Sequence, residues 1–153
     1  MKPPFISIII PTLNEERYIE NTLKAIRNQD YRGKYEVVIA DAKSRDSTLR
    51  IAKKYTDKVV SVKKKGIGAG RNAGARHAKG DILLFLDADT IPSKNLLSSL
   101  AATFINKRIV GATCKILPNT SDKSIKTVYK LFNKFMKLTI KMNRASIAGV
   151  CCS

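Results

Sequence analysis

The chain has few of the residues that build zinc sites and disulfide frameworks. It contains three cysteines, Cys114, Cys151 and Cys152, and a single histidine, His77, with no C-x-x-C pair. Zinc sites and disulfide scaffolds need more such residues, at closer and repeated spacings. The sequence therefore excludes both, and we interpret the thiols as buried or spare side chains.

Long apolar runs and a leader segment are also missing from the sequence. No apolar run reaches the roughly 18 residues that a membrane-spanning helix requires. The N-terminal residues Met1–Phe5 lack the apolar stretch and the cleavage site of a secretory signal. We therefore expect a cytoplasmic location. The basic C-terminal segment described below leaves peripheral attachment at the inner face of the membrane as an alternative.

Acidic residues are scarce in this chain. It has 12 Asp and Glu against 29 Lys and Arg, which gives a net charge of +17 over 153 residues. This length and the 44% apolar content fit one globular domain. The charge predicts an anionic partner, such as nucleotide phosphates, anionic lipid or nucleic acid, but does not choose among them.

Short β-rich runs alternate with amphipathic stretches of helix length along the first two-thirds of the chain. The runs 5–10, 35–40, 58–62 and 81–86 predict strands, and the nearly continuous apolar character of the first indicates that both its faces are buried. The helices expected between and after them cover 14–28 with Asn14 as N-cap, 46–55, 69–78 and 94–106. A further strand is expected over 109–117 and a long helix over 122–143. The alternation predicts an α/β fold with a mainly parallel sheet.

Acidic residues follow three of the expected strands. The first strand leads to a turn ending in Glu15, the second to Asp41, and the fourth to Asp87 and Asp89. Ligands of an open parallel sheet bind beyond the carboxyl ends of its strands, so these groups are expected to converge. Asp-x-Asp on extended backbone places two carboxylates on one side, and such hard oxygen ligands suit Mg²⁺ or Mn²⁺.

A glycine-rich loop over 63–74 opens the third expected helix. Its glycines let backbone amides approach an anion, and Arg71 can offer a planar fork to phosphate or base oxygens. A flexible loop with a capping glycine is the plain alternative. Residues 68–73 also fit the G-x-G-x-x-G/A pattern of dinucleotide-binding proteins, with Asp87 at the end of the next strand. That alternative leaves Asp41 and Asp89 without roles.

Four segments in this order and at these spacings resemble family 2 glycosyltransferases. They are 7–15 (SIIIPTLNE), Asp41 with 44–48 (SRDST), 70–74 (GRNAG) and 79–89 (KGDILLFLDAD), which lie within about residues 5 to 90. The resemblance implies a GT-A fold, which is a Rossmann-like three-layer α/β/α arrangement. It also implies a nucleotide-diphosphate sugar donor, UDP- or GDP-linked, and a divalent Mn²⁺ or Mg²⁺ ion.

The same resemblance implies roles for seven side chains, which are Pro11, Thr12, Glu15, Asp41, Arg71, Asp87 and Asp89. The first three would line the nucleoside pocket, while Asp41 would hydrogen-bond the base and Arg71 would contact the nucleotide. Asp87 would lie near the ribose and the metal, and Asp89 would be the main protein ligand of the ion.

The sequence departs from the family pattern in two places. Lys43 and Arg45 stand where members carry an acidic-glycine-serine run, which leaves base contacts other than Asp41 open. After Asp89 the only acid is Asp122, which does not match the motif of the family's catalytic base, so no base is nominated. The resemblance favours inversion of configuration.

We expect a nucleotide-sugar-binding part over 1–118, and over 119–153 a basic helix and the start of an acceptor-side region, incomplete within this chain. The chain would then be a piece of a longer enzyme, or a homologue that binds the donor without turnover.

A stripe of lysines marks the last expected helix. They recur every three or four residues, at Lys123, Lys126, Lys130, Lys134, Lys137 and Lys141, and bulky apolar residues fill the rest. This pattern suits an anionic membrane surface and hence a lipid-linked acceptor, or otherwise a glycan. Core packing with a solvated lysine face, or docking of further residues, are the alternatives. A basic nucleic-acid-binding protein would need a recognised motif that the sequence lacks, so nucleic acid is not expected as a partner.

Overall fold

A four-stranded, entirely parallel sheet forms the centre of the molecule. The computed structural model describes residues 2–64, 66–106, 108–114, 117–118 and 120–141. The strands are β1 (Ile6–Thr12), β2 (Tyr35–Asp41), β3 (Val59–Ser61) and β4 (Ile82–Phe85), in the spatial order β3-β2-β1-β4. The predicted α/β class and parallel sheet are therefore confirmed.

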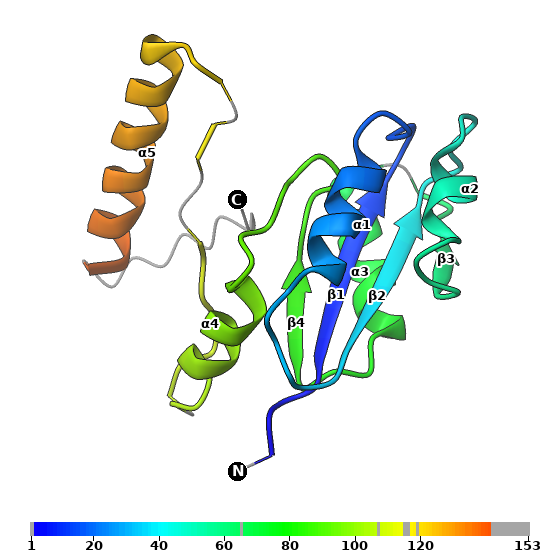
Figure 1. The fold of residues 1–153 in the computed structure, drawn as a ribbon, viewed down its shortest axis with the longest axis horizontal. Coiled ribbons are helices and arrows are strands. Elements are labelled where there is room, and N and C mark those ends of the chain that lie inside the picture. The colour runs from blue at the N-terminus through cyan, green and yellow to red at the C-terminus, as the bar shows by residue number, and fades with distance from the viewer. Residues whose placement is uncertain (1, 65, 107, 115–116, 119, 142–153) are drawn as a thin grey trace.

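Helices cover both faces of this sheet (Figure 1). The helices α1 (Ile19–Arg27), α2 (Thr48–Ala52) and α4 (Leu96–Thr103) share a core with the strands, while α3 (Ile67–His77) lies on the opposite face. Strand β1 is buried along almost its whole length, because alternate side chains face these two helix layers. The arrangement is the three-layer α/β/α sandwich that was expected.

Helix α3 approaches the sheet closely because two of its residues are glycines. A Cβ atom added to Gly70 would lie 2.8 Å from the Cβ of Pro11, and one added to Gly74 would lie 2.4 Å from Cγ2 of Ile9. Neither position has room for a side chain. The glycine-rich segment therefore positions a helix against the sheet, which fits the expected helical start better than a flexible loop.

Two local predictions are wrong. The first helix begins at Ile19, not after an Asn14 cap, because Asn14 has a left-handed backbone (φ 57°) and its side chain accepts a hydrogen bond from Arg45 in another loop. No strand forms over residues 108–114 or at Leu117 within the described part of the chain. A β-rich run becomes a strand only when a neighbour pairs with it. The helix 46–55 is also shorter, at Thr48–Ala52.

The predicted basic helix is present as α5 (Lys123–Lys141), apart from the sheet on the side of α4 (Figure 1). The carboxylate of Asp122 accepts a hydrogen bond from the backbone N–H of Ser124 at 2.7 Å, as a helix cap does. Residues 142–143, Cys151 and Cys152 lie outside the described residues. Among the helices that the structure describes, none combines the length and apolar character needed to cross a membrane.

Candidate functional site

The carboxyl ends of β1 and β2 lie side by side at one rim of the sheet. Thr12 and Asp41 are direct partners in the register of these two strands. The backbone N–H of Leu86 donates to the carbonyl of Ile9 at 3.0 Å, so the chain after β4 reaches the same rim on the other side of β1. The convergence of the three predicted strand ends is observed.

The carboxylate of Asp41 is buried and hydrogen-bonded at this rim. It is 2% exposed, and the Thr12 hydroxyl donates to Oδ1 at 2.9 Å. Ser44 donates its hydroxyl to Oδ1 and its backbone N–H to Oδ2, the latter at 2.9 Å. Three donors therefore hold the carboxylate in a fixed orientation, and Ser44 is a functional candidate for which sequence reasoning gave no role.

Two loops at the rim are tied to each other, and we call residues 13–17 and 42–48 the paired loops. Five hydrogen bonds join them: Asn14 N–H to Ser44 Oγ (2.9 Å), Arg45 N–H to Asn14 Oδ1 (2.9 Å), Glu15 N–H to Thr48 Oγ1 (2.7 Å), Glu16 N–H to Asp46 Oδ2 (3.1 Å) and Ser47 N–H to Glu16 Oε2 (2.8 Å). Asn14 and Lys43 both have positive φ angles. Strained backbone of this kind persists only where surrounding bonds hold it. In the sequence, only the polar run over 44–48, mostly of short side chains, indicated this arrangement.

Four acidic side chains lie on one part of the rim, where three of them influence the fourth, Glu15, through their charge. Partial burial raises the pKa of Glu15 above its usual 4.5, and the neighbouring charges of Asp89, Asp46 and Asp87 raise it further. These carboxylates come from three separate segments of the chain. Crowded carboxylates of this kind attract a cation.

Asp87 and Asp89 differ in their surroundings. Asp87 is half-buried and its Oδ1 forms an ion pair with Arg71 at 2.9 Å, which links the loop after β4 to α3. Asp89 is exposed, and its carboxylate makes no hydrogen bond or ion pair with the described residues. Asp89 is therefore the freer of the two to bind a ligand from solution.

Arg71 has unused hydrogen-bonding capacity. Its side chain is 20% exposed, and its Nε atom is buried without a hydrogen-bond partner among the described residues. A buried, unpaired N–H is costly, so such a group is expected to find a partner in a bound state. An anion or a polar base edge would supply one.

The residues at the rim fit a divalent cation that is shared with a ligand. Among the described residues, no three His, Cys, Asp or Glu side chains are grouped as a metal site. Mg²⁺ and similar ions are commonly held by one or two carboxylates, with substrate phosphates and water as the other ligands. Asp89 and the second oxygen of Asp87 fit that role.

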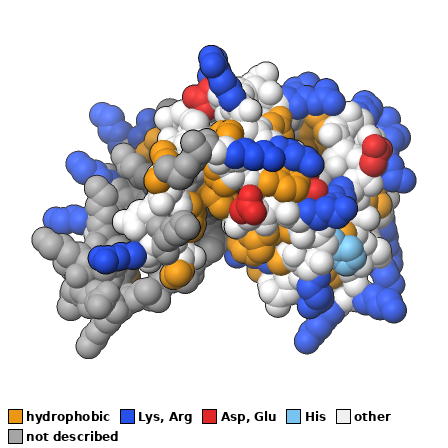
Figure 2. Space-filling model, turned by 90° about the horizontal axis from the view of Figure 1, so that it is seen from below, with side chains coloured by type: hydrophobic (Ala, Val, Ile, Leu, Met, Phe, Trp, Pro, Cys, Tyr) orange, Lys and Arg blue, Asp and Glu red, His pale blue; other side chains and the backbone are white. Residues whose placement is uncertain are grey.

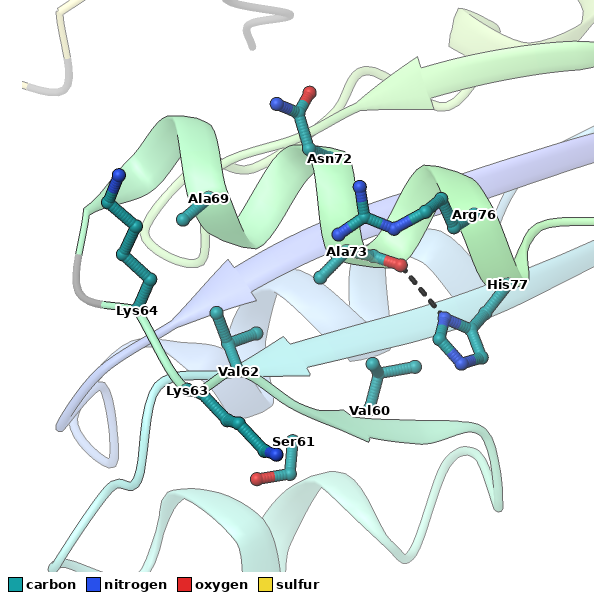
Figure 3. Close-up of a pocket in the computed structure, with 10 residues that line it drawn as sticks. All are labelled: Val60, Ser61, Val62, Lys63, Lys64, Ala69, Asn72, Ala73, Arg76 and His77. Atoms are coloured by element: carbon teal, nitrogen blue, oxygen red, sulfur yellow. Dashed lines mark hydrogen bonds between the residues drawn. The ribbon is translucent and has the colours of Figure 1, made fainter.

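A groove between β3 and α3 lies apart from these residues (Figure 3). Its volume is about 580 Å³, and it is lined by Val60, Ser61, Val62, Lys63, Lys64, Ala69, Asn72, Ala73, Arg76 and His77. None of the predicted site residues lines it. His77 is exposed, and its Nδ1 bonds to the carbonyl of Ala73 at 2.9 Å. Figure 2 shows His77 on a face where lysine and arginine side chains greatly outnumber acidic ones.

Comparison with known families and proteins gives consistent matches. The family model of "Glycosyl transferase family 2" matches residues 7–153. Over 108 residues the chain is 36% identical to the poly(ribitol-phosphate) beta-N-acetylglucosaminyltransferase TarS of Staphylococcus aureus, which covers 66% of this chain and 19% of that protein. A dolichyl N-acetyl-alpha-D-glucosaminyl phosphate 3-beta-D-2,3-diacetamido-2,3-dideoxy-beta-D-glucuronosyltransferase of Methanococcus voltae is 35% identical over 142 residues, or 82% of this chain and 44% of that protein.

Solved structures agree with the sequence matches. The S. aureus TarS 1–349 complex with UDP-GlcNAc has a TM-score of 0.66 at 32% identity, covering 80% of this chain and 36% of that one. The mannosyltransferase PcManGT from Pyrobaculum calidifontis, solved with GDP-Man and Mn²⁺, has a TM-score of 0.63 at 30% identity, covering 77% and 37%. These matches confirm the expected GT-A fold. The chain spans less than half the length of each of these relatives.

Proposed function

Since this chain belongs to glycosyl transferase family 2, we propose that it binds a UDP- or GDP-linked sugar and transfers the sugar to an acceptor with the help of Mn²⁺ or Mg²⁺. The observation that carries the proposal is the Arg71–Asp87 ion pair, beside the exposed Asp89 and on the same rim as Asp41. These residues come from α3, the loop after β4 and the end of β2. They bring a base-binding acid, an anion-binding arginine and metal-binding carboxylates to one edge.

Asp41 is the residue we assign to the nucleotide base. A carboxylate accepts about four hydrogen bonds, and Thr12 and Ser44 supply three of them. The remaining position can accept an N–H of the base. Pro11 and Glu15 would border this pocket, because they lie just before and shortly after Thr12, the strand partner of Asp41.

Asp89 and Asp87 are the residues we assign to the divalent ion. When bound, the ion would act as a Lewis acid and stabilise the negative charge that develops on the leaving nucleotide as the sugar–phosphate bond breaks. Arg71 orients Asp87 through the ion pair, and its unpaired Nε would donate to the nucleotide. Glu15 would add negative charge beside the ion.

The relatives support the choice of donor. S. aureus TarS has been solved with UDP-GlcNAc and the P. calidifontis mannosyltransferase with GDP-Man, so both bases remain in the proposal. For the acceptor we propose a glycan or a lipid-linked sugar at a membrane surface, for which the α5 helix is the supporting feature. Inversion, a cytoplasmic location and the division at residue 118 remain predictions. The dinucleotide-binding alternative gives Asp41 and Glu15 no role and is not proposed.

Calorimetric titration with UDP and with GDP, each with and without Mn²⁺, tests this function. The wild-type chain is expected to bind one nucleotide at least about tenfold more tightly with Mn²⁺, since loss of even an indirect metal contact costs that much. Asp89→Asn should abolish this gain. Asp57→Asn is the matched control, because Asp57 is exposed beside β3 at the amino-terminal edge of the sheet. Equal Mn²⁺ dependence in Asp89→Asn and wild type would remove Asp89 from the metal site.

A second candidate is a donor-binding module without turnover. It is supported by Asp122, because its carboxylate is engaged in capping α5, where it accepts a hydrogen bond from the backbone N–H of Ser124. Release of free nucleotide from UDP-GlcNAc or GDP-Man separates the two candidates. Tight Mn²⁺-dependent binding without nucleotide release, with or without added acceptor glycans, would favour the module.

A further inference from the structure

A buried threonine on α1 holds the turn that carries both metal-binding carboxylates. The hydroxyl of Thr22 donates a hydrogen bond of 2.7 Å to the backbone carbonyl of Ala88, 66 residues away in the sequence. Thr22 is 0% exposed and Ala88 is 4% exposed. The bond therefore lies inside the core, shielded from competing water.

Threonine is unusual in this position. In the interior of a helix its hydroxyl commonly bonds to the carbonyl one turn earlier in the same helix, and its helix propensity is low. Here the backbone N–H of Thr22 bonds to the carbonyl of Tyr18, while the hydroxyl leaves the helix to reach the loop after β4. The side chain thus serves a contact between two segments of the chain.

The accepting carbonyl lies between Asp87 and Asp89. Its orientation fixes the peptide plane that joins Ala88 to Asp89, and that plane sets the relative directions of the two carboxylates. Within the described part of the chain, Thr22 is the donor that satisfies this carbonyl. Backbone bonds hold the turn on either side, from Leu86 N–H to Ile9 O at 3.0 Å and from Thr90 N–H to Asp87 O at 3.2 Å.

We propose that Thr22 is a positioning residue for the metal-binding turn, acting through the Ala88 carbonyl on the direction of the Asp89 carboxylate. The inference rests on the proposed function, because it concerns the same ion. Thr22 itself would contact neither donor nor ion, since its side chain is fully buried on the inner side of α1. Its effect is confined to the metal side of the rim, because the Asp41 pocket is held by Thr12 and Ser44 instead.

Two substitutions separate the hydroxyl from the packing. Thr22→Val keeps the shape of the side chain and removes the donor, whereas Thr22→Ser keeps the donor and removes a methyl group. Titration with the matching nucleotide is carried out in EDTA and again in Mn²⁺. In Thr22→Val, the increase in nucleotide affinity caused by Mn²⁺ is expected to be about tenfold smaller than in wild type, as for other groups that orient metal ligands. The nucleotide affinity in EDTA should be unchanged. Thr22→Ser should restore the gain.

Hydrogen exchange of the ligand-free proteins provides a readout that does not depend on metal. The backbone amides over 87–90 should exchange faster in Thr22→Val than in wild type and Thr22→Ser, while those of Asp41 and Ala42 should be unchanged. An unchanged Mn²⁺-dependent gain in Thr22→Val would overturn the inference and leave the proposed function intact. An equal loss of affinity in EDTA and in Mn²⁺ would show a general structural role instead. A wild-type chain without any Mn²⁺-dependent gain would overturn both.

Discussion

Glu15 is the residue whose protonation depends most directly on the assembly of the rim. Its pKa is raised because it is partly buried and because Asp89, Asp46 and Asp87 are close. The folded chain therefore binds the Glu15 proton more tightly than the unfolded chain does. Stability is lost as pH rises from about 4.5 through this raised pKa, since the unfolded state then releases the proton more readily.

Replacement of Glu15 by Gln should remove this loss. We expect Glu15→Gln to have a higher urea midpoint than wild type at about pH 7, because the substituted side chain cannot add to the crowded negative charge. The difference should shrink as pH falls to 4 and below, where Glu15 becomes increasingly protonated in both states. Urea unfolding at several pH values, without divalent cations, measures it.

Glu20 gives a control of opposite sign for this experiment. Its pKa is lowered by a hydrogen bond and charge interaction with Lys24, so its contribution is present above about pH 4.5 and lost as pH falls. Glu20→Gln should therefore lower the midpoint at neutral pH. A gain for Glu15→Gln that is equally large at pH 4 and pH 7 would contradict the electrostatic cause.

At the scale of elements, the close packing of α3 on the sheet brings Arg71 to the rim. Gly70 lies against Pro11, and Gly74 lies against Ile9. The helix therefore sits nearer to β1 than a helix with side chains at these positions could. That distance matters for the site because Arg71 follows Gly70 directly and reaches Asp87 from there.

Substitution of Gly74 by Ala should test this packing. The added Cβ would meet Ile9 at 2.4 Å, so we expect a loss of about 1–3 kcal/mol, as for other overpacked cores. Gly68→Ala is the matched control in the same helix, because nothing lies within 4 Å of its added Cβ. It should gain about 0.5–1 kcal/mol from helix propensity. Urea unfolding of both variants measures the difference, and equal midpoints would refute the account.

The sequence predicted those elements whose information is local. Strand β1 could be predicted because a short, nearly continuous apolar run has few interpretations other than a strand that is buried on both faces. The convergence of the acids at the strand ends could be predicted because the sheet was expected to be parallel. The predicted N-cap at Asn14 was wrong because the partners of Asn14 lie 30 and 31 residues away, in the other of the paired loops. The Thr22–Ala88 bond was equally hidden, since it joins residues 66 positions apart. Long-range polar contacts of this kind leave no periodic pattern in a sequence.

At the scale of the whole molecule, the excess of positive charge combines with an exposed amphipathic helix. Along α5 the exposed side chains include Lys126 and Lys130, and also a set of large apolar residues, namely Ile125, Val128, Leu131, Phe132 and Phe135. An apolar face with a lysine stripe suits the surface of a membrane that contains anionic lipids. The charge of the rest of the chain would add to the attraction.

Flotation with lipid vesicles tests this attachment. The chain is expected to float with vesicles containing phosphatidylserine, not with purely zwitterionic ones, and to be released by about 1 M salt, where charge interactions reach only about 3 Å. Lys126→Glu with Lys130→Glu should weaken binding severalfold more than Lys53→Glu with Lys94→Glu, although both pairs change the net charge equally. Equal loss in the two variants would assign the effect to overall charge, and no flotation at low salt would end the membrane proposal.

The ion pair between Arg71 and Asp87 and the bonds between the paired loops have one more consequence. They hold the rim together through bonds between the protein's own groups. In the proposed enzyme, the metal could then arrive together with each incoming donor and depart with the spent nucleotide. The metal would bind and leave as a complex with the nucleotide, and the cellular concentration of that complex would set the occupancy of the site.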